Sequence, residues 1–361
     1  MKRILAGIAA AVMVAVLAFP LRVNAVSAEK AVVYDAQTGR LLYEKNSDSR
    51  GLIASTTKIM TALVICEQCN VLDRMRIPRE AVGIEGSSMY LREGEVLTIQ
   101  ELLYGLMLHS GNDAAVALAI YCGGTVEGFV QLMNDKAYAL NLKNTHFDNP
   151  NGLDSPGQYS TAADMAVLTA YAMNHPIFAQ IVSTKTVTAG GRSLRNHNKL
   201  LWRLEGADGV KTGFTKAAGR ILVSSATRQD RRLIAVTMRD PNDWQDHTQL
   251  LEMGFSGFAV QNILYKGDRV DTVEVAGGRE DLVELIAQES FSYPLAQGET
   301  VSIVISGVGF VYAPAVSGEA AGTAYICVDG AVVGSVPLVF GSTVEMLPEE
   351  KVSFWQRIFG G

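Results

Sequence analysis

The sequence contains few cysteines and has no excess of basic residues. Four cysteines in 361 residues cannot supply the framework of a disulfide-built miniprotein. Lys and Arg number 31 against 37 Asp and Glu, which gives a formal charge of −6. General nucleic-acid binding requires a cationic face that displaces counterions, so this charge argues against it. We therefore expect no nucleic acid among the partners of the chain.

Charged residues are also scarce in total, at 19%, whereas hydrophobic residues make up 48% of the chain. This composition excludes a mostly disordered protein, because such proteins lack the apolar residues that form a core. A chain of 361 residues is long enough for two domains, at least one of them with a large core.

Long hydrophobic runs are absent except at the N-terminus. There, two basic residues precede an uncharged run, Ile4–Leu21, and small residues mark two candidate cleavage sites, after Ala25 and after Ala28. This pattern predicts a secretory signal peptide over residues 1–25. An uncleaved signal anchor is the alternative, because the run is close to membrane-spanning length.

Removal of the predicted signal peptide would make the protein more acidic. Cleavage after Ala25 removes three basic residues and no acidic one, so 37 acidic residues would face 28 basic residues, for a charge of about −9. A secreted product would act outside the cytoplasmic membrane.

The cysteines give little support to a redox or metal site. Cys66 and Cys69 form a Cys-x-x-Cys in an apparently helical stretch, and Cys122 and Cys327 lie far away in the sequence. Such a pair can be redox-active or half of a zinc site, but no second Cys/His pair with ligand spacing follows. We interpret the cysteines as small helix-packing residues, and we expect neither a metal nor another cofactor.

The pattern of hydrophobic residues changes along the chain. A hairpin is predicted over residues 31–46. Helical spacing predicts helices over residues 55–66, 97–119 (interrupted near 110–112) and 161–173. Three successive strands are predicted over residues 209–214, 220–228 and 231–239. Together these elements predict an α+β domain in which helices flank an antiparallel sheet.

Beyond residue 258 the composition changes to short β-type runs separated by Gly-rich turns. These runs cover residues 270–275, 282–286, 301–305, 323–328 and 331–340. Asp329-Gly330 between the last two is a strong hairpin signal. We therefore predict a small all-β module that carries no catalytic grouping.

The C-terminal residues form a separate pattern. Val352, Trp355, Ile358 and Phe359 recur at helical spacing, with basic residues among them. A short helix lying at a membrane interface has this pattern. A frayed tail that packs on the β module fits it equally well.

One short motif could carry serine chemistry. Ser55-Thr56-Thr57-Lys58 places a hydroxyl and an amine one helical turn apart on the same face. A serine becomes nucleophilic when a base takes its proton, and lysine can be that base if burial or nearby cations lower its pKa. The pattern alone is weak, because Ser27-Ala28-Glu29-Lys30 has the same form beside a predicted cleavage site.

Two further motifs strengthen the first. Ser110-Gly111-Asn112 interrupts a helical region, and its hydroxyl and amide could relay a proton and hold a substrate amide. Lys211-Thr212-Gly213 lies on a predicted strand that leads into Phe214, and a strand edge can pair with an extended peptide. Each motif alone also fits a helix cap, a turn or a solvated strand. All three in this order, on helix, loop and strand, indicate a serine active site.

The same trio occurs in class A β-lactamases and penicillin-binding proteins. The chain resembles the low-molecular-mass penicillin-binding proteins, specifically the serine-type D-alanyl-D-alanine carboxypeptidases, over nearly its whole length. Further matching segments are Tyr34-Asp35, Thr38-Gly39, Phe147–Leu153, Tyr159–Thr161, Asp164–Ala166, Asn196–Asn198, Leu200-Leu201, Gly209–Lys216, Ala218–Arg220 and Val223–Thr227. The β module and the amphipathic tail also match the layout of this family.

The resemblance implies a domain order. A β-lactamase/transpeptidase-like catalytic domain would cover residues 29–257, a C-terminal β-sandwich-like domain residues 258–345, and an amphipathic tail residues 346–361. The protein would act on the cell wall or periplasmic side, with peripheral contact of the tail at the outer face of the cytoplasmic membrane. Its partners would be peptidoglycan stem peptides, and β-lactam antibiotics would inhibit it.

The resemblance also implies a reaction. Ser55 would attack the carbonyl between the two terminal D-alanines of a stem pentapeptide, form an acyl-enzyme and limit cross-linking of the wall. Lys58 would be the general base, kept neutral by burial and by Lys211. No cofactor takes part in this reaction. β-Lactams would acylate Ser55 because they mimic the terminal dipeptide.

The remaining motif residues have roles implied in the same way. Ser110 and Asn112 would pass the proton to the leaving amine and align the substrate. On the strand, the residues themselves suggest that Lys211 supplies positive charge, that Thr212 donates to a substrate carboxylate and that Gly213 permits close approach. The backbone N–H groups of Ser55 and Phe214 would form the oxyanion hole. His109 adjoins Ser110, and we expect it to pack rather than to take part.

One family feature has no evident counterpart in the sequence. Some members carry an arginine after the last strand of the catalytic domain that helps to hold the substrate carboxylate. Here that region reads Asp240-Pro241-Asn242-Asp243-Trp244, directly after Arg239. Carboxylate binding beyond Thr212 and Lys211 is therefore open.

Three other functions compete. A β-lactamase would need a carboxylate that activates water after the Ser-x-Asn, where Asp148, Asp154 and Asp164 lie but no glutamate does. A non-catalytic penicillin-binding sensor would be expected to carry signalling transmembrane segments, and none is evident. A peptidoglycan endopeptidase would use the same residues and cannot be separated from a carboxypeptidase by sequence.

Overall fold

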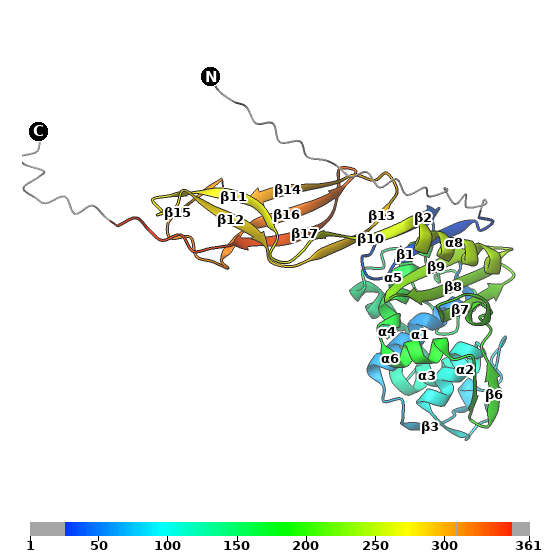
Figure 1. Cartoon of the computed structure of the whole chain (residues 1–361). Helices are drawn as coiled ribbons and strands as arrows, with labels where there is room; N and C mark the ends of the chain where they lie inside the picture. Colours follow the sequence, from blue (N-terminus) through cyan, green and yellow to red (C-terminus); the bar gives the residue numbers. More distant parts are fainter. Residues whose placement is uncertain (1–25, 308, 349–361) are drawn as a thin grey trace, which may run out of the picture.

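The computed structural model describes residues 26–307 and 309–348. The predicted signal peptide, residues 1–25, and most of the predicted amphipathic tail lie outside the described residues. Figure 1 shows a helix-and-sheet region and an elongated β module that extends away from it. Within the described ranges, no single helix is both long and apolar enough to cross a membrane; only the helices α3 (Asn112–Gly123) and α4 (Val126–Ala139) together, bent by 84°, meet those criteria.

A five-stranded antiparallel sheet forms the centre of the first region, as predicted. Its strands, in spatial order, are β2 (Leu41–Lys45), β1 (Lys30–Asp35), β9 (Arg231–Met238), β8 (Gly219–Arg228) and β7 (Ala207–Thr215). The predicted hairpin is β1–β2, and the three predicted strands are β7, β8 and β9. Because β7 stands at the end of this order, one of its edges is free to pair with another chain.

Helices cover both faces of this sheet. Alternate residues of β9 belong to two different apolar clusters, with Ile234 and Val236 on one face and Leu233 and Ala235 on the other. The first face meets α5 (Ala162–Met173), and the second meets α8 (Asp243–Gly257). Two buried faces explain why these strands read as nearly continuous hydrophobic runs.

A second layer of helices surrounds α1 (Lys58–Gln68). It contains α2 (Ile99–Leu108), α3 (Asn112–Gly123), α4 (Val126–Ala139) and α6 (Pro176–Ser183), whereas the short α7 (Leu200–Arg203) contacts β7 and belongs to the cluster on the α8 side of the sheet. The helix predicted over 55–66 begins as a 3-10 turn, η1 (Ala54–Thr57), and becomes α-helical at Lys58. The helix predicted over 97–119 is interrupted as expected, between α2 and α3. Helix α5 begins at the predicted cap, where Thr161 Oγ1 accepts a hydrogen bond from the Asp164 amide.

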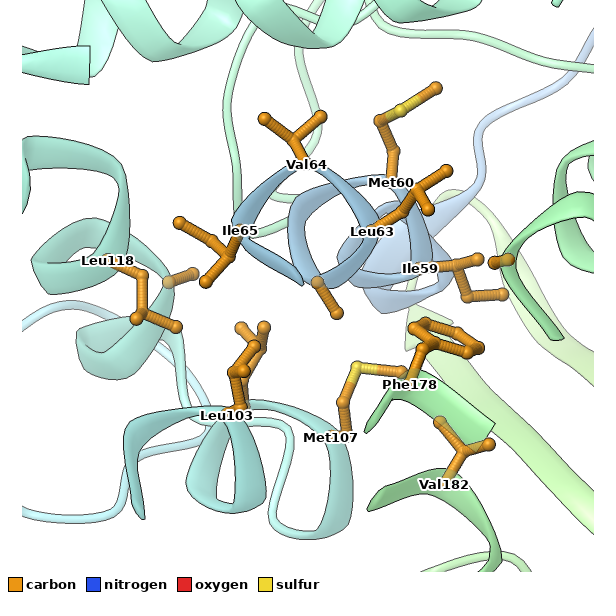
Figure 2. Close-up of a cluster of buried hydrophobic side chains, with 14 of the residues drawn as sticks. Ile59, Met60, Leu63, Val64, Ile65, Leu103, Met107, Leu118, Phe178 and Val182 are labelled. Atoms are coloured by element: carbon orange, nitrogen blue, oxygen red, sulfur yellow. The ribbon is translucent and has the colours of Figure 1, made fainter. Parts of the chain in front are cut away.

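Helix α1 is buried around its circumference. Figure 2 shows Ile59, Leu63 and Ile65 of α1 among side chains from α2, α3 and α6. Leu103 and Phe178 are among these neighbours, and both are buried. Each such buried side chain contributes about 1.5–3 kcal/mol relative to exposure, so the position of this helix is strongly fixed.

Short elements complete the first region. Two small hairpins are β3 (Arg74–Arg76) with β4 (Val96–Thr98), and β5 (Thr186–Ala189) with β6 (Arg192–Arg195). A second 3-10 turn, η2, covers Arg79–Ala81.

The β module begins at β10 and has a separate apolar cluster. Its strands are β10 (Phe258–Leu264), β11 (Arg269–Ala276), β12 (Leu282–Ala287), β13 (Phe291–Ala296), β14 (Val301–Gly307), β15 (Phe310–Tyr312), β16 (Ala320–Val328) and β17 (Ala331–Phe340). They form a six-stranded sheet, in the order β14-β16-β17-β12-β11-β15, and a two-stranded sheet of β10 and β13. The hairpin predicted at Asp329-Gly330 joins β16 to β17.

Three strands of the module, β10, β13 and β15, were not predicted from the sequence. β10 is largely exposed, β13 contains Pro294, and β15 has only three residues. Proline inside a run argues against a strand, and a short exposed run has no buried face to produce alternation.

One arginine joins the module to the first region. The Arg40 guanidinium pairs with Glu299 and lies 5.0 Å from the ring centroid of Phe258 and 5.1 Å from that of Tyr293. This contact combines an ion pair with two cation–π interactions, so it fastens β10 and β13 beside the β1–β2 turn.

Candidate active site

The three motifs of the sequence meet at one end of α1. Ser55 lies in the η1 turn that leads into this helix, and the preceding Ala54 has a positive φ of 45°. Gly152 packs against this turn so closely that a Cβ at position 152 would lie 1.9 Å from the Ala54 carbonyl oxygen. Only glycine fits there, and the contact holds the Ser55 turn in place.

Lys58 is the first residue of α1 and is fully buried. Its Nζ lies 2.9 Å from Ser55 Oγ, and it donates hydrogen bonds to Asn112 Oδ1 at 2.7 Å and to the carbonyl of Asn151. The amine therefore faces the hydroxyl that we expect to be the nucleophile. The two carbonyl oxygens of Asn112 and Asn151 fix the direction of the amine, so its lone pair can face Ser55 Oγ.

The protonation of Lys58 follows from this burial. Burial lowers the pKa of the Lys58 amine well below its usual value, and the nearby positive charge of Lys211 lowers it further, while Asp113 acts in the opposite direction. Desolvation penalises the charged form because the surroundings are less polar than water. A neutral amine at this position can accept the proton of Ser55 Oγ.

The second motif lies between two helices. Ser110 has a φ of 60° in the break between α2 and α3, and Asn112 is the first residue of α3. The Asn112 amide has both ends engaged, since Oδ1 accepts from Lys58 and Nδ2 donates to the carbonyl of Glu85 at 2.6 Å. Its orientation beside Lys58 is thereby fixed.

The third motif lies on β7. The Lys211 side chain is buried, and its Nζ donates to Ser110 Oγ at 3.1 Å and to the carbonyl of Thr212 at 2.8 Å. Burial lowers the pKa of the Lys211 amine to about 7. A chain of contacts thus runs from Lys211 to Ser110, and a second contact set runs from Lys58 to Ser55 and Asn112.

β7 also approaches the backbone of the nucleophile. A Cβ at Gly213 would lie 3.2 Å from the carbonyl oxygen of Ile53 and 3.3 Å from the amide nitrogen of Ser55. Glycine permits this approach at little cost. Phe214 follows it with 64% of its surface exposed, so the motif opens onto solvent.

These residues border a cleft of about 510 Å³. Its lining residues are Ser55, Ser87, Ser110, His197, Lys199, Thr212, Gly213, Phe214, Arg220, Ile221, Asp243 and Trp244. A larger hollow of about 760 Å³, near Arg228 and Phe258, contains none of the three motifs. We place the active site in the smaller cleft, because the serine–lysine pair opens there.

Several lining residues were not identified as site residues from the sequence. Arg220 borders the cleft on β8, where its guanidinium makes a two-pronged ion pair with the buried carboxylate of Asp243. Arg239, which precedes Asp240, instead donates to the carbonyl of Ala217. Arg220 is thus a basic group at the cleft, and it lies on a strand rather than after the last one.

Two histidines also lie near the second motif. The rings of His109 and His197 are 5.5 Å apart between centroids, and only His197 is among the residues that line the cleft. Burial lowers the pKa of His197, and the nearby Lys211 and His109 add to this effect. His109 is half-buried beside His197, and its exclusion from the chemistry stays a prediction.

A buried carboxylate supports the cleft wall. Asp113, next to Asn112, accepts hydrogen bonds from the amides of Met89 and Leu91 and from the hydroxyl of Ser88. These bonds hold the segment that carries Ser87 at the cleft. Sequence reasoning did not identify this role, because nothing in the spacing connects the two segments.

The carboxylates that a β-lactamase could use are engaged elsewhere. Asp148 accepts from Ser155 Oγ and from the Gly157 amide, Asp154 from Thr215 Oγ1, and Asp164 from Thr145 Oγ1. None of the three carboxylates is among the residues that border the cleft. Their hydrogen bonds stabilise loops around the site instead.

No group of three or more His, Cys, Asp or Glu side chains in residues 26–307 and 309–348 is arranged to hold a metal ion. Cys66 is buried on α1, as its interpretation as a packing residue requires.

Comparison with known proteins identifies two family models along the chain. Residues 18–242 match the model described as D-alanyl-D-alanine carboxypeptidase, and residues 258–346 match that of the C-terminal domain of penicillin-binding protein 5. The chain is 33% identical to D-alanyl-D-alanine carboxypeptidase DacF of Bacillus subtilis, over 92% of this chain and 89% of that protein. It is 36% identical to DacD of Escherichia coli, over 74% and 73% of the two chains.

Solved structures give the same grouping. Penicillin-binding protein 5 from Haemophilus influenzae matches with a TM-score of 0.76 and 32% identity, over 89% of this chain and 98% of that one. Penicillin-binding protein 6B from Escherichia coli matches with a TM-score of 0.71 and 31% identity, over 87% and 95% of the two chains. Both the catalytic region and the β module therefore have counterparts in solved proteins.

Proposed function

The chain belongs to the D-alanyl-D-alanine carboxypeptidase family, and from this premise we propose that Ser55, Lys58 and Ser110 carry out its reaction. The protein is a serine-type hydrolase that removes the terminal D-alanine of peptidoglycan stem peptides and binds β-lactams covalently. The observation that carries the assignment of residues is the buried Lys58 amine, 2.9 Å from Ser55 Oγ.

The first half of the reaction is acylation. Neutral Lys58 takes the proton of Ser55, and Oγ attacks the carbonyl carbon between the two D-alanines. The amide nitrogens of Ser55 and Phe214 stabilise the negative charge that develops on the carbonyl oxygen. The close approach of Gly213 to the Ser55 amide supports this pairing.

The second half releases the two products. The proton held by Lys58 passes to the leaving amine, with Ser110 as relay, and D-alanine departs. Water then attacks the ester on Ser55 and frees the shortened peptide. Asn112 holds the amide of the substrate, because its own amide is fixed beside Lys58. No cofactor enters either half.

The terminal carboxylate of the substrate needs a cationic site. We assign it to Thr212 and Lys211, with Arg220 at the cleft as the additional basic group. The Arg220 side chain is 45% exposed, so it can form a further bond to substrate while it remains paired with Asp243. Arg220 would thus serve as the carboxylate-binding arginine that we could not locate after the last strand of the catalytic domain.

The location of the protein follows from the same family assignment. We assign residues 1–25 to a signal peptide, residues 29–257 to the catalytic domain, residues 258–345 to the β domain and residues 346–361 to a membrane-contacting tail. Action outside the cytoplasmic membrane fits these assignments, because the substrate is the cell wall. The basic and aromatic residues of the tail, with Trp355 among them, support contact with the outer face of that membrane.

The rival activities differ in what happens to the acyl-enzyme. A β-lactamase would hydrolyse penicillin rapidly, whereas the engagement of Asp148, Asp154 and Asp164 elsewhere supports a long-lived adduct. An endopeptidase would cut cross-linked dimers with the same residues. Neither rival has an observation in its favour at the cleft.

The experiment is mass spectrometry of a stem pentapeptide after incubation with the protein. We expect the loss of one alanine, together with a stable benzylpenicillin adduct on the intact protein. Ser55→Ala should abolish both, and Ser49→Ala, at an exposed serine six residues earlier, should change neither. Release of alanine by Ser55→Ala would refute the assigned nucleophile, and rapid penicillin turnover would favour a β-lactamase.

A further inference from the structure

The first described residues of the chain are built into the catalytic region. Val26 and Ala28 are buried and belong to the apolar cluster between the sheet and α8. Lys45 Nζ donates to the carbonyl oxygen of Val26 at 2.8 Å. These residues therefore behave as part of the fold, although one of the two candidate cleavage sites, after Ala28, would remove them.

Ser27 lies between two acidic side chains. Its amide nitrogen donates to Asp246 Oδ2 at 2.6 Å, and its Oγ lies 2.9 Å from Asp240 Oδ1 and 2.8 Å from Asp246 Oδ2. A hydroxyl has a single proton, so it can donate to only one of these two carboxylates at a time. The Asn242 amide also donates to Asp240 Oδ1 at 3.0 Å, so Ser27 has one hydroxyl proton to share between the two carboxylates.

These carboxylates also lack a cation within the described part of the chain. Asp240 is 1% exposed, and its Oδ2 has no hydrogen-bond partner there. No Lys, Arg or His nitrogen of the described residues lies within 4.0 Å of either carboxylate: Lys45 is directed to Val26, and Arg239 pairs with Glu29. Two neighbouring buried carboxylates are unfavourable unless a positive charge joins them.

The surroundings of Asp240 agree with a missing positive charge. Burial raises the pKa of Asp240, and the charge of Asp246 adds to this effect, although hydrogen bonds from hydroxyls act against it. His247 beside them is bonded to Ser224 and Thr237, so its ring nitrogens are already engaged.

We propose that cleavage of the Ala25–Val26 bond creates this cation, and that the new α-ammonium group of Val26 binds the carboxylates of Asp240 and Asp246. Hydrolysis adds water across the bond, so Ala25 leaves with a carboxylate and the Val26 nitrogen becomes an amine that takes up a proton. Consecutive Cα atoms are about 3.8 Å apart, so this nitrogen lies within one residue of the Ser27 amide that already contacts Asp246.

The proposal decides between the two cleavage sites. Cleavage after Ala28 would remove two buried side chains and leave Asp240 and Asp246 without any of the donors from Ser27. Cleavage after Ala25 keeps these donors and adds a charged one. Processing of the precursor would thereby complete the packing of α8 on the sheet. The inference rests on the proposed signal peptide, but not on the catalytic assignments.

The test begins with the secreted full chain. Its intact mass should correspond to residues 26–361, and its α-amine should react with acetic anhydride at pH 8 at least tenfold more slowly than that of a matched variant. That variant carries Gly-Ser inserted after Ala25, which moves the amine away from the carboxylates. It should also melt at a lower temperature, because a buried ion pair is lost.

Substitutions then identify the carboxylates. Asp246→Asn should bring the reactivity of the Val26 amine close to that of the Gly-Ser variant, while Asp48→Asn, at an exposed site, should leave it unchanged. A chain that begins at Glu29, an uncleaved chain, or an amine equally reactive in both wild type and Gly-Ser variant would overturn the proposal. If Asp246→Asn fails to fold, the reactivity of the α-amine in the wild type compared with that in the Gly-Ser variant still tests the proposal. Acylation by benzylpenicillin, measured in parallel, tests the proposed function separately.

Discussion

The two regions of the molecule bury different kinds of side chain. The catalytic region buries two lysines, Lys58 and Lys211, along with several Asn, Asp, Ser and Thr side chains. In the described residues of the β module, the buried side chains are apolar, and only Tyr293 and Cys327 among them carry a polar atom. Burial of an amine without full compensation costs free energy, whereas an apolar core does not incur this cost.

This difference separates the tasks of the two regions. A fold retains costly buried groups where chemistry needs them, and the two buried lysines here lie beside Ser55 and Ser110. The module instead resembles a simple packed scaffold, fastened to the catalytic region at Arg40. Each of the following predictions tests one side of this contrast.

The largest effect is expected from removal of the buried base. Lys58→Met should lower the rate of acylation by benzylpenicillin at least a thousandfold, because Ser55 loses its proton acceptor. The stability should fall little or rise, since a methionine of similar length needs no hydrogen bonds. Lys143→Met, at an exposed lysine, is the matched control for both acylation rate and melting temperature. A normal acylation rate in Lys58→Met would show that the buried amine is not the base that activates Ser55.

A smaller effect is expected at the edge of the cleft. Arg220→Gln should reduce kcat/KM for a stem pentapeptide about tenfold, mainly through a higher KM, because one bond to the substrate carboxylate is lost. Arg239→Gln should leave kcat/KM within twofold, since that side chain is bonded outside the cleft. An unchanged KM in Arg220→Gln would mean that Arg220 does not bind the substrate carboxylate and that Thr212 and Lys211 bind it alone.

The smallest effect on catalysis is expected from the module. Leu338→Ala should destabilise the protein by about 2–5 kcal/mol, because Leu338 is fully buried in the apolar cluster of the module. The acylation rate should nevertheless stay within twofold of wild type. Leu103→Ala, in the cluster around α1, should destabilise to a similar extent and also slow acylation. Denaturant unfolding and stopped-flow acylation measure the two quantities, and a slow Leu338→Ala enzyme would show that the module is not a passive scaffold.

The same contrast explains how far the sequence could predict the molecule. The strands of the central sheet and the helices α1, α2, α3 and α5 could be predicted, because their apolar spacing reflects buried faces. The helices α4, α6, α7 and α8 and the two small hairpins were not predicted. The three motifs were predictable because each places its functional residues within four positions of one another. Serine and lysine act through their side chains, and glycine acts by having none. The resemblance led us to expect that the three motifs lie together in one site. The distances between their side chains could be obtained only from the structure.

The features that sequence analysis missed leave no local pattern of side chains in the sequence. The carbonyl of Asn151 that accepts from Lys58 is a backbone group, and a backbone group has no signature in the sequence. Arg220 and Asp243 come together from a strand and a helix 23 residues apart. The strands β13 and β15 lack a clear pattern, because one contains a proline and the other is very short.

The most direct test of the central claim is the pH dependence of acylation. We measure the rate constant for acylation of wild-type protein by benzylpenicillin between pH 7 and pH 10, with melting temperature at each pH as the control for folding. If burial keeps Lys58 neutral, its pKa lies well below its usual value and the rate should level off within this range of pH. A rate that rises tenfold per pH unit up to pH 10 would mean an ordinary lysine that is mostly protonated, and it would contradict the proposed mechanism.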